Sequence, residues 1–305
     1  MPKPAALRFQ TETLPRGQVM QDSETQFDTE VGGEHRPDLY DHDSIAERIS
    51  VRQAAAEPAR LHYQQHGWLA VQSLFDPAEV ITAMEAVDDL ILGRVPGFNG
   101  RIYEAAVRDR LPRMGEQDRY DAVRKLFRFV AFEPRLQALC RHPSLMAIVG
   151  NLLGGKTPRL FQDMALLKPP LIGREKPWHQ DHAFFDLSLE TRFLGVWIAL
   201  DSATIENGCM HVLDGGHRQG PRTHFRRRDV QICDADVLGQ RSVAFPLEPG
   251  DAMVFDGLLP HGTPANVSAN RRRALQFHYC PDDAVEVDPK LRLQVFGSEG
   301  KDATC

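Results

Sequence analysis

The 305-residue sequence contains little cysteine, no long hydrophobic run and no large excess of either charge. Its five cysteines are scattered, and no two are spaced as a CxxC pair, so we expect neither a disulfide scaffold nor a thiolate zinc site. No stretch approaches the roughly 20 consecutive apolar residues that span a bilayer, and the N-terminus lacks the apolar core of a secretory signal. A net charge of -6 argues against a nucleic-acid-binding surface and a polybasic membrane anchor. These absences predict a cytoplasmic protein without nucleic-acid or membrane partners.

The hydrophobic content, 42% of the residues, is sufficient for a sizeable core. Residues 1–42 are polar and aperiodic, and we expect them to form an extended or partly disordered arm. Residues 43–290 are expected to form a single catalytic domain whose N-terminal half is helical. The remaining residues, 291–305, are expected to form a C-terminal tail.

Helix signals dominate the first half of the chain. The clearest begins at Asp76, a residue type that caps helices, with Pro77 at the first helical position. Apolar residues then recur every three or four positions until Gly93, which ends the pattern. The predicted elements of this half are a helix-favouring segment over 44–66 that Pro58 kinks or splits, a strand over 67–71, and helices between Asp76 and Gly93, near 133–141 and near 143–153.

After Gly155 the sequence changes to short apolar runs separated by Gly, Pro, Asp and Asn. Regularly spaced short strands with turn residues between them are typical of a β-sandwich or barrel. A doubly wound parallel sheet would need helices between the strands, and this region has none of useful length. The sequence therefore predicts a mainly β fold with α, in which N-terminal helices buttress a C-terminal antiparallel β-core.

Histidines cluster in the C-terminal half and suggest a metal site. His179 and Asp181 are two positions apart, so an extended backbone would project both side chains to one side. His261 follows an apolar strand and is the best candidate for a third ligand. Two imidazoles and one carboxylate leave three positions of an octahedral ion open, which suits non-haem Fe(II) with a cosubstrate and O2. A His-x-Asp pair alone is common, and ordinary hydrogen-bonded histidines are the alternative.

Three consecutive arginines, residues 271–273, provide a second feature. Period-two alternation places Arg272 on the same side of a strand as Gln276 and His278. If that side faces the interior, Arg272 needs a carboxylate partner to offset its desolvation. The far carboxylate of 2-oxoglutarate would supply one through a bidentate pair. Arg271 and Arg273 are expected to face solvent.

Together the segments 178–187, 196–217, 249–266 and 271–275 resemble the phytanoyl-CoA dioxygenase family of Fe(II)- and 2-oxoglutarate-dependent oxygenases. The resemblance covers roughly residues 60–280 and implies a double-stranded β-helix, the jelly-roll or cupin-like fold. It implies His179, Asp181 and His261 as iron ligands, Arg272 as the anchor of 2-oxoglutarate, and Thr263, Trp197, Met164 and Lys125 as further cosubstrate neighbours. For Trp197 and Met164, packing in the core is an equal alternative.

The reaction implied by the resemblance is oxidation of an unactivated C–H bond of a small molecule, with succinate and CO2 as coproducts. Halogenases related to this family have Ala or Gly at the carboxylate position, so the retained Asp181 favours hydroxylation or a related oxidation over halogenation. The basic loop over residues 217–230 would suit a carboxylate-, phosphate- or CoA-bearing substrate, unless it is simply solvated. Two alternatives remain: a cupin-type metalloenzyme that does not use 2-oxoglutarate, and a non-catalytic jelly-roll binding module.

Overall fold

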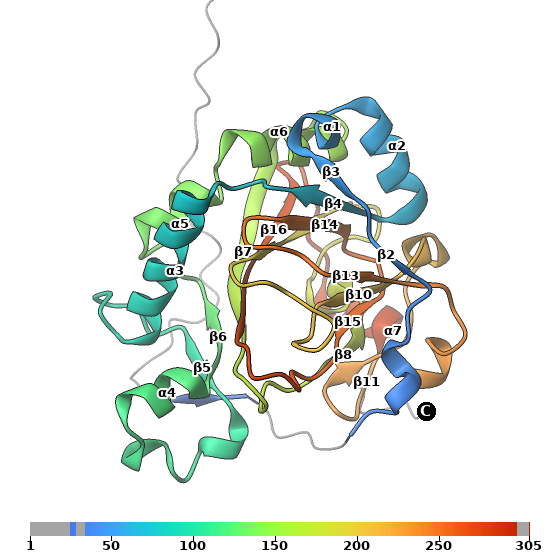
Figure 1. Cartoon of the computed structure of the whole chain (residues 1–305). Helices are drawn as coiled ribbons and strands as arrows, with labels where there is room; N and C mark the ends of the chain where they lie inside the picture. The colour runs from blue at the N-terminus through green and yellow to red at the C-terminus, as the bar shows by residue number, and fades with distance from the viewer. Residues whose placement is uncertain (1–24, 29–33, 298–304) are drawn as a thin grey trace, which may run out of the picture.

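The computed structural model of the chain describes residues 25–28, 34–297 and 305. Two β-sheets lie face to face, and helices cover the outer face of the larger sheet (Figure 1). In spatial order, the larger sheet consists of β1 (Gln26–Phe27), β5 (Arg101–Tyr103), β6 (Val123–Phe127), β7 (Pro158–Lys168), β16 (Arg272–Pro281), β9 (Leu194–Ala199), β14 (Ala252–Asp256), β4 (Trp68–Gln72) and β3 (Arg48–Ser50). The smaller sheet consists of β2 (Ser44–Ile45), β13 (Ser242–Phe245), β10 (Met210–Leu213), β15 (His261–Thr263) and β8 (Lys176–His179). A separate hairpin pairs β11 (Phe225–Arg226) with β12 (Val230–Gln231).

The helices lie mainly in the N-terminal half, as the sequence predicts. The α-helices of the described residues are α1 (Val51–Ala54), α2 (Glu57–His66), α3 (Pro77–Ile91), α4 (Glu116–Ala122), α5 (Pro134–Leu139), α6 (Pro143–Leu152) and α7 (Pro289–Phe296). Asp76 caps α3 by accepting hydrogen bonds from the backbone N–H groups of Ala78 and Glu79, which confirms the predicted helix start.

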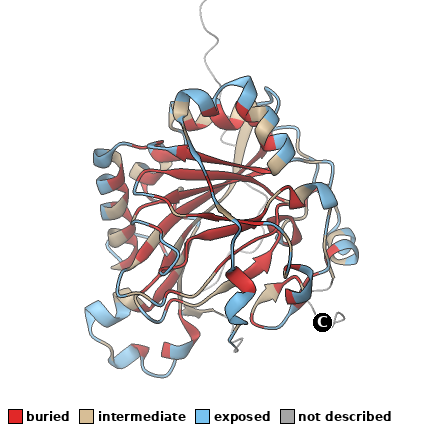
Figure 2. Cartoon of the chain, turned by 45° about the vertical axis from the view of Figure 1, so that its right-hand side comes forward, coloured by how far each residue is buried: buried red, intermediate tan, exposed pale blue. Residues whose placement is uncertain are grey.

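Two layers of buried apolar side chains hold the sheets and helices together. Between the helices and the larger sheet, Val87 and Leu90 of α3 belong to the same cluster as Leu275 of β16. Between the two sheets, Trp197 of β9 packs in a cluster with Phe245 of β13. Figure 2 shows the strands almost entirely buried, whereas the outward faces of the helices are exposed. The fold is therefore a two-sheet β-core buttressed by helices.

The helix expected over residues 44–66 forms only from Val51 onward. The residues before it form β2 and β3, which run parallel to β13 and β4. Pro58 lies in the first turn of α2, so the expected split is present. Pairing with distant strands overrides the helix propensity of the first residues.

An extended or partly disordered arm was expected over residues 1–42, of which residues 1–24 and 29–33 lie outside the described residues. Residues 34–42 do not form such an arm. Pro37–Tyr40 forms a 3-10 helix, η1. Leu39 and Tyr40 are buried in a cluster with Trp178. Long-range apolar contacts therefore order a segment whose own sequence is mostly polar.

The boundary expected for a C-terminal tail, at residue 291, falls inside α7. Phe296 is 2% exposed and its ring stacks on His182 with the centroids 5.9 Å apart. Arg292 donates hydrogen bonds to Asp186 and to the backbone oxygen of Ala183. The end of the domain thus packs against the segment that follows His179.

Cys233 and Cys305 form a disulfide, which the scattered cysteines did not predict. The other three cysteines are free and buried.

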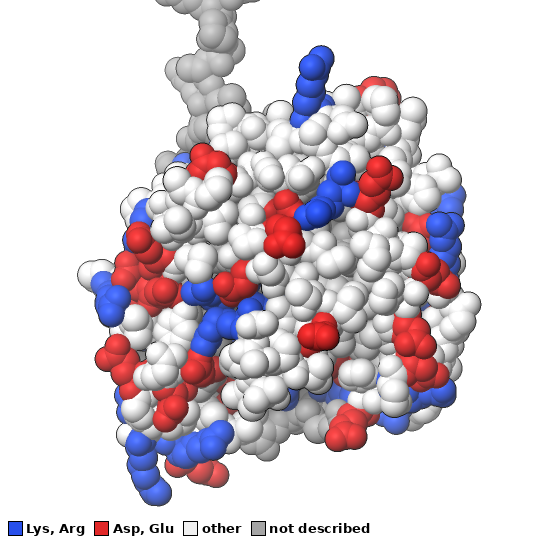
Figure 3. Space-filling view, in the orientation of Figure 1, with Lys and Arg blue, Asp and Glu red and all other residues white. Residues whose placement is uncertain are grey.

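Among the described residues, no helix combines the length and the apolar character needed to cross a bilayer. Figure 3 shows acidic and basic side chains interspersed over the visible face of the molecule.

Candidate active site

The three predicted metal ligands meet between the two sheets. His179 ends β8 and His261 begins β15, and the two residues are directly opposite each other in the antiparallel pairing of these strands. Gln180 keeps an extended backbone, so Asp181, at the start of the 3-10 helix η4 (Asp181–Phe184), turns back toward both imidazoles. Its Oδ1 lies 3.3 Å from Nε2 of His179 and 3.5 Å from Nε2 of His261. All three residues are buried, and one ligand atom from each lies within 4.8 Å of the others.

Both imidazoles are oriented for metal binding. Nδ1 of His179 lies 2.7 Å from the carbonyl oxygen of Pro177, and Nδ1 of His261 lies 2.9 Å from that of Leu259. Each Nδ1–H therefore donates to a backbone carbonyl, which leaves the Nε2 lone pair directed at the common point. Burial, with the neighbouring His261 ring, lowers the pKa of His179 to about 3, so this imidazole is in its neutral, ligating form.

The second carboxylate oxygen of Asp181 is held by two residues of β16. Its Oδ2 lies 2.7 Å from Nε2 of His278 and accepts a hydrogen bond of 3.2 Å from the amide nitrogen of Gln276. These contacts fix the carboxylate with Oδ1 facing the histidines. The sequence had placed Gln276 and His278 on the face of Arg272 but had given them no role.

Removing the support of Asp181 is expected to weaken metal binding. We predict that His278→Ala lowers the affinity for Fe(II) about 10- to 100-fold, because partners of ligand side chains have effects of that size. Anaerobic titration of Fe(II) into the apoprotein measures the affinity. His211→Ala is the control, since His211 is equally buried but does not contact Asp181. An equal loss in the two variants would contradict a specific role for His278.

The turn between His179 and Asp181 is fixed by Gln180, which is fully buried. Its amide nitrogen donates to the carbonyl oxygens of Gly220 and Leu258, at 2.9 and 2.7 Å. Its backbone N–H donates to Nε2 of His224 at 3.0 Å. These bonds join the two ligand-bearing segments, because Leu258 precedes His261 by three residues.

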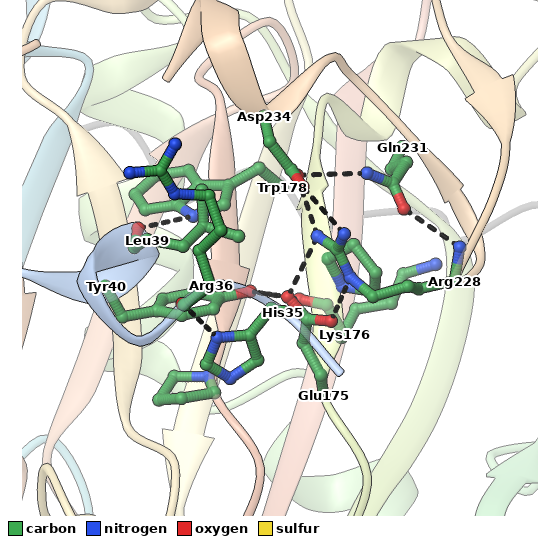
Figure 4. A network of polar contacts seen from close by, with 12 residues as sticks. His35, Arg36, Leu39, Tyr40, Glu175, Lys176, Trp178, Arg228, Gln231 and Asp234 are labelled. Atoms are coloured by element: carbon green, nitrogen blue, oxygen red, sulfur yellow. Dashed lines mark hydrogen bonds and ion pairs between the residues drawn. The ribbon is translucent and has the colours of Figure 1, made fainter. Parts of the chain in front are cut away.

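A polar network supports the outer side of β8 (Figure 4). Arg228 is buried and forms ion pairs of 2.7 Å with both Glu175 and Asp234. Tyr40 donates a hydrogen bond of 2.7 Å to Glu175, and Trp178 donates to the backbone of Leu39. The docked N-terminal segment and the loop before β12 thus clamp the strand that carries His179.

Breaking this network should destabilise the protein. We predict that Arg228→Met lowers the free energy of unfolding by about 3–5 kcal/mol, because it leaves buried Asp234 and largely shielded Glu175 without their cation. Denaturant unfolding measures the change. Arg36→Met is the control, since Arg36 pairs with Asp38 on the exposed surface and should change the midpoint little. Equal midpoints for the two variants would contradict the structural role of Arg228.

A cavity of about 190 Å³ opens beside the three ligands. Its wall is built from the facing sides of β7 and β16, where Arg272 lies opposite Lys168 and Gln276 lies opposite Met164. Phe184 and Phe185 of the segment after Asp181 add aromatic rings. The basic residues that line the cavity are Arg124, Lys125, Lys168, Arg174, Lys176 and Arg272.

Arg272 points into this cavity, on the side of β16 that it shares with Gln276. It is 2% exposed, and its guanidinium lies 5.3 Å from the centre of the Trp197 ring. Its Nε is buried without a partner, and among the described residues no carboxylate lies within ion-pair distance of it. Burial lowers the pKa of Arg272 to about 10. A buried cation without an anion is costly, so the site is suited to a ligand that carries a carboxylate.

The other predicted cosubstrate neighbours also line the cavity: Thr263, Trp197, Met164 and Lys125. The indole nitrogen of Trp197 is buried without a hydrogen-bond partner. Because an indole N–H can only donate, a bound ligand oxygen would satisfy it. Core packing alone therefore does not account for Trp197.

Arg271 and Arg273 do not face solvent, contrary to expectation. Arg273 forms a bidentate pair with Asp201, at 2.8 and 2.9 Å. Arg271 pairs with Asp121 and lies over the ring of Tyr120. The helices and loops outside the larger sheet supply these partners, which alternation along one strand does not indicate.

Comparison with known proteins agrees with this geometry. The model of the phytanoyl-CoA dioxygenase (PhyH) family matches residues 63–274. The chain belongs to the phytanoyl-CoA dioxygenase family. A zebrafish (Danio rerio) relative, phytanoyl-CoA dioxygenase domain-containing protein 1, is 29% identical over 181 residues, which cover 57% of this chain and 59% of the relative.

Solved structures share the family's fold. EvdO2 from Micromonospora carbonacea, crystallised with 2-oxoglutarate, has a TM-score of 0.59 and 27% identity, covering 79% of this chain and 96% of EvdO2. EctD from S. alaskensis, crystallised with 2-oxoglutarate and 5-hydroxyectoine, has a TM-score of 0.62 and 20% identity, covering 90% of this chain and 88% of EctD. The predicted jelly-roll core is confirmed.

The basic loop over residues 217–230 does not line the cavity beside the metal ligands. Arg228 is used in the network behind β8, and Arg222 donates to the backbone of Asp236 and to Gln219. Arg222 and Arg228 therefore have a structural use, whereas Arg226 lines the adjoining cavity that shares Lys125, Lys176 and Phe184 with the first.

Sequence reasoning missed two polar residues of β7 that line the cavity. Lys168 and Gln162 alternate with Met164 on the inward side of this strand, opposite Arg272 and His278. The period of two along β7 was available as a signal. What the sequence did not show is that β7 and β16 are neighbours.

Proposed function

We propose that this protein is an Fe(II)- and 2-oxoglutarate-dependent dioxygenase that hydroxylates an unactivated C–H bond of a small molecule. The observation that carries the proposal is the buried His179–Asp181–His261 group, which faces a cavity that also holds the unpaired Arg272. The donor set, two imidazoles and one carboxylate, fits Fe(II) with open positions. When bound, iron and 2-oxoglutarate would supply the oxidising chemistry, with O2 as the oxidant and succinate and CO2 as coproducts.

The residues of this chain would position the reactants. His179, Asp181 and His261 would hold the iron, while Arg272 would pair with the far carboxylate of 2-oxoglutarate. Thr263, Trp197, Met164 and Lys125 would contact the cosubstrate from the surrounding strands. Phe184 and Phe185 would exclude water and hold the substrate close to the reaction centre.

The inward orientation of Arg272 supports this proposal over a cupin-type enzyme that does not use 2-oxoglutarate. A non-catalytic binding module would have no need for imidazoles that direct their Nε2 atoms at a carboxylate oxygen. The retained Asp181 supports hydroxylation over halogenation, because it fills the position that chloride occupies in related halogenases. The cytoplasm remains the predicted location.

The charges of the cavity support an anionic substrate. Arg124 and Arg174 pair with Glu104, and Lys176 pairs with Asp229. Lys125 has no acidic partner within ion-pair distance among the described residues, and burial lowers its pKa to about 8. A second cavity of about 270 Å³ shares Lys125, Lys176 and Phe184 with the first and leaves room for a larger substrate.

The proposed reaction is tested by following 2-oxoglutarate. Under air, the Fe(II)-loaded protein should convert 2-oxoglutarate to succinate, and a substrate from a panel of carboxylate- and phosphate-bearing small molecules should accelerate this conversion. Mass spectrometry of the accelerating compound should show the gain of one oxygen atom. Succinate formation that does not require Fe(II), or a product that gains chlorine, would contradict the proposal.

A further inference from the structure

Lys168 is a second buried cation beside Arg272. It ends β7 and lies directly opposite Arg272 in the antiparallel pairing with β16. It is 4% exposed, and both residues line the same cavity. Two basic side chains therefore stand next to each other in a site shielded from water.

The ammonium group of Lys168 is held by the backbone after His261. It donates a hydrogen bond of 3.1 Å to the carbonyl oxygen of Thr263 and a second to that of Pro264. An ammonium has three N–H donors, and the third has no acceptor among the described residues. Gly208 lies against this group, because a Cβ there would come within 3.1 Å of the Lys168 nitrogen. The surrounding backbone is thus shaped around the lysine.

We propose that Lys168 is a specificity-determining residue for the cosubstrate, which together with Arg272 binds the far carboxylate of a 2-oxo dicarboxylic acid. This inference rests on the proposed function, because it takes 2-oxoglutarate to be the ligand of Arg272. The carboxylate would accept the third N–H of Lys168 and the free guanidinium donors of Arg272. Its negative charge would offset the repulsion between the two cations.

The electrostatics of the pair support the proposal. Among the described residues, no carboxylate lies within ion-pair distance of either side chain. Burial and the charge of Arg272 lower the pKa of Lys168 well below its ordinary value. Like charges that share a desolvated site are unfavourable unless an anion joins them. A ligand with a negative group at this end of the cavity supplies that anion, whereas a ligand with a methyl group there does not.

Comparing two ligands distinguishes a role of Lys168 in carboxylate binding from a purely structural role. In the Fe(II)-loaded protein without O2, the dissociation constants of 2-oxoglutarate and 2-oxopentanoate are measured; the second compound has a methyl group in place of the far carboxylate. We expect Lys168→Met to weaken 2-oxoglutarate about 10- to 100-fold, the effect of losing one charge-assisted hydrogen bond. Binding of 2-oxopentanoate should be nearly unchanged. Lys156→Met is the control, because Lys156 lies on the surface and pairs with exposed Asp283.

Two further variants keep the proposal testable if Lys168→Met folds poorly. Lys168→Gln retains an N–H donor for the backbone carbonyls but lacks the charge, so it should show the same loss of selectivity. Arg272→Met leaves Lys168 intact and should still prefer 2-oxoglutarate over 2-oxopentanoate. Equal weakening of both ligands in the lysine variants, or no remaining preference in Arg272→Met, would overturn the role of Lys168. If the wild-type protein bound neither ligand, the proposed function itself would fail.

Discussion

Replacing either ligand histidine, in His179→Ala or His261→Ala, should abolish Fe(II) binding and 2-oxoglutarate turnover. Each imidazole directs its Nε2 atom at the common point, and among the described residues only these two histidines and Asp181 form a group that could hold a metal ion. The loss in affinity should exceed about 100-fold, the upper end of the effects seen when only a partner of a ligand is removed. Anaerobic Fe(II) titration and succinate release measure the two losses.

His142→Ala is the control for the removal of a histidine, because His142 is partly exposed at the start of α6, pairs with Glu79 and does not line the cavity. It should bind iron and turn over 2-oxoglutarate as the unaltered protein does. Succinate release at the unaltered rate from either ligand variant would show that the iron is bound elsewhere.

Arg272→Met should weaken 2-oxoglutarate binding by about 30- to 5000-fold, the range expected when one partner of a buried, hydrogen-bonded charge pair is truncated. Iron binding should be retained, because Arg272 contacts none of the three ligands directly. The saturation curves for 2-oxoglutarate and for Fe(II) measure the two affinities separately.

The control is Arg273→Met, the same change one residue along the strand. Arg273 points to the other side of the sheet and pairs with Asp201, so its loss should lower stability without changing the affinity for 2-oxoglutarate. Loss of iron in Arg272→Met at unchanged 2-oxoglutarate affinity would show that Arg272 is not the anchor.

The features that the sequence predicted are those set by local patterns. Asp76 and Pro77 mark the start of α3, and alternation along β16 places Arg272 on one side with Gln276 and His278. The spacing of His179 and Asp181 was enough to predict that both side chains face the same point, because one extended residue separates them. The third ligand, His261, was predicted from its position after an apolar strand, and the pairing of β15 with β8 brings it to the site.

The features that the sequence did not predict depend on which strands become neighbours. Residues 44–50 form strands because β13 and β4 offer free edges to them. Lys168 acquires its place only when β7 pairs with β16. Likewise, Arg228 belongs to a basic run in the sequence, yet Glu175 and Asp234 bury it. Partners that lie far apart along the chain cannot be read from the residues next to each position.

Anaerobic addition of 2-oxoglutarate to the Fe(II)-loaded protein tests the central claim most directly. The account predicts a weak visible absorption band that requires both components, saturates at one cosubstrate per chain and is absent from His261→Ala. A protein that binds Fe(II) but shows no band with 2-oxoglutarate, or one that gives the same band without His261, would contradict it.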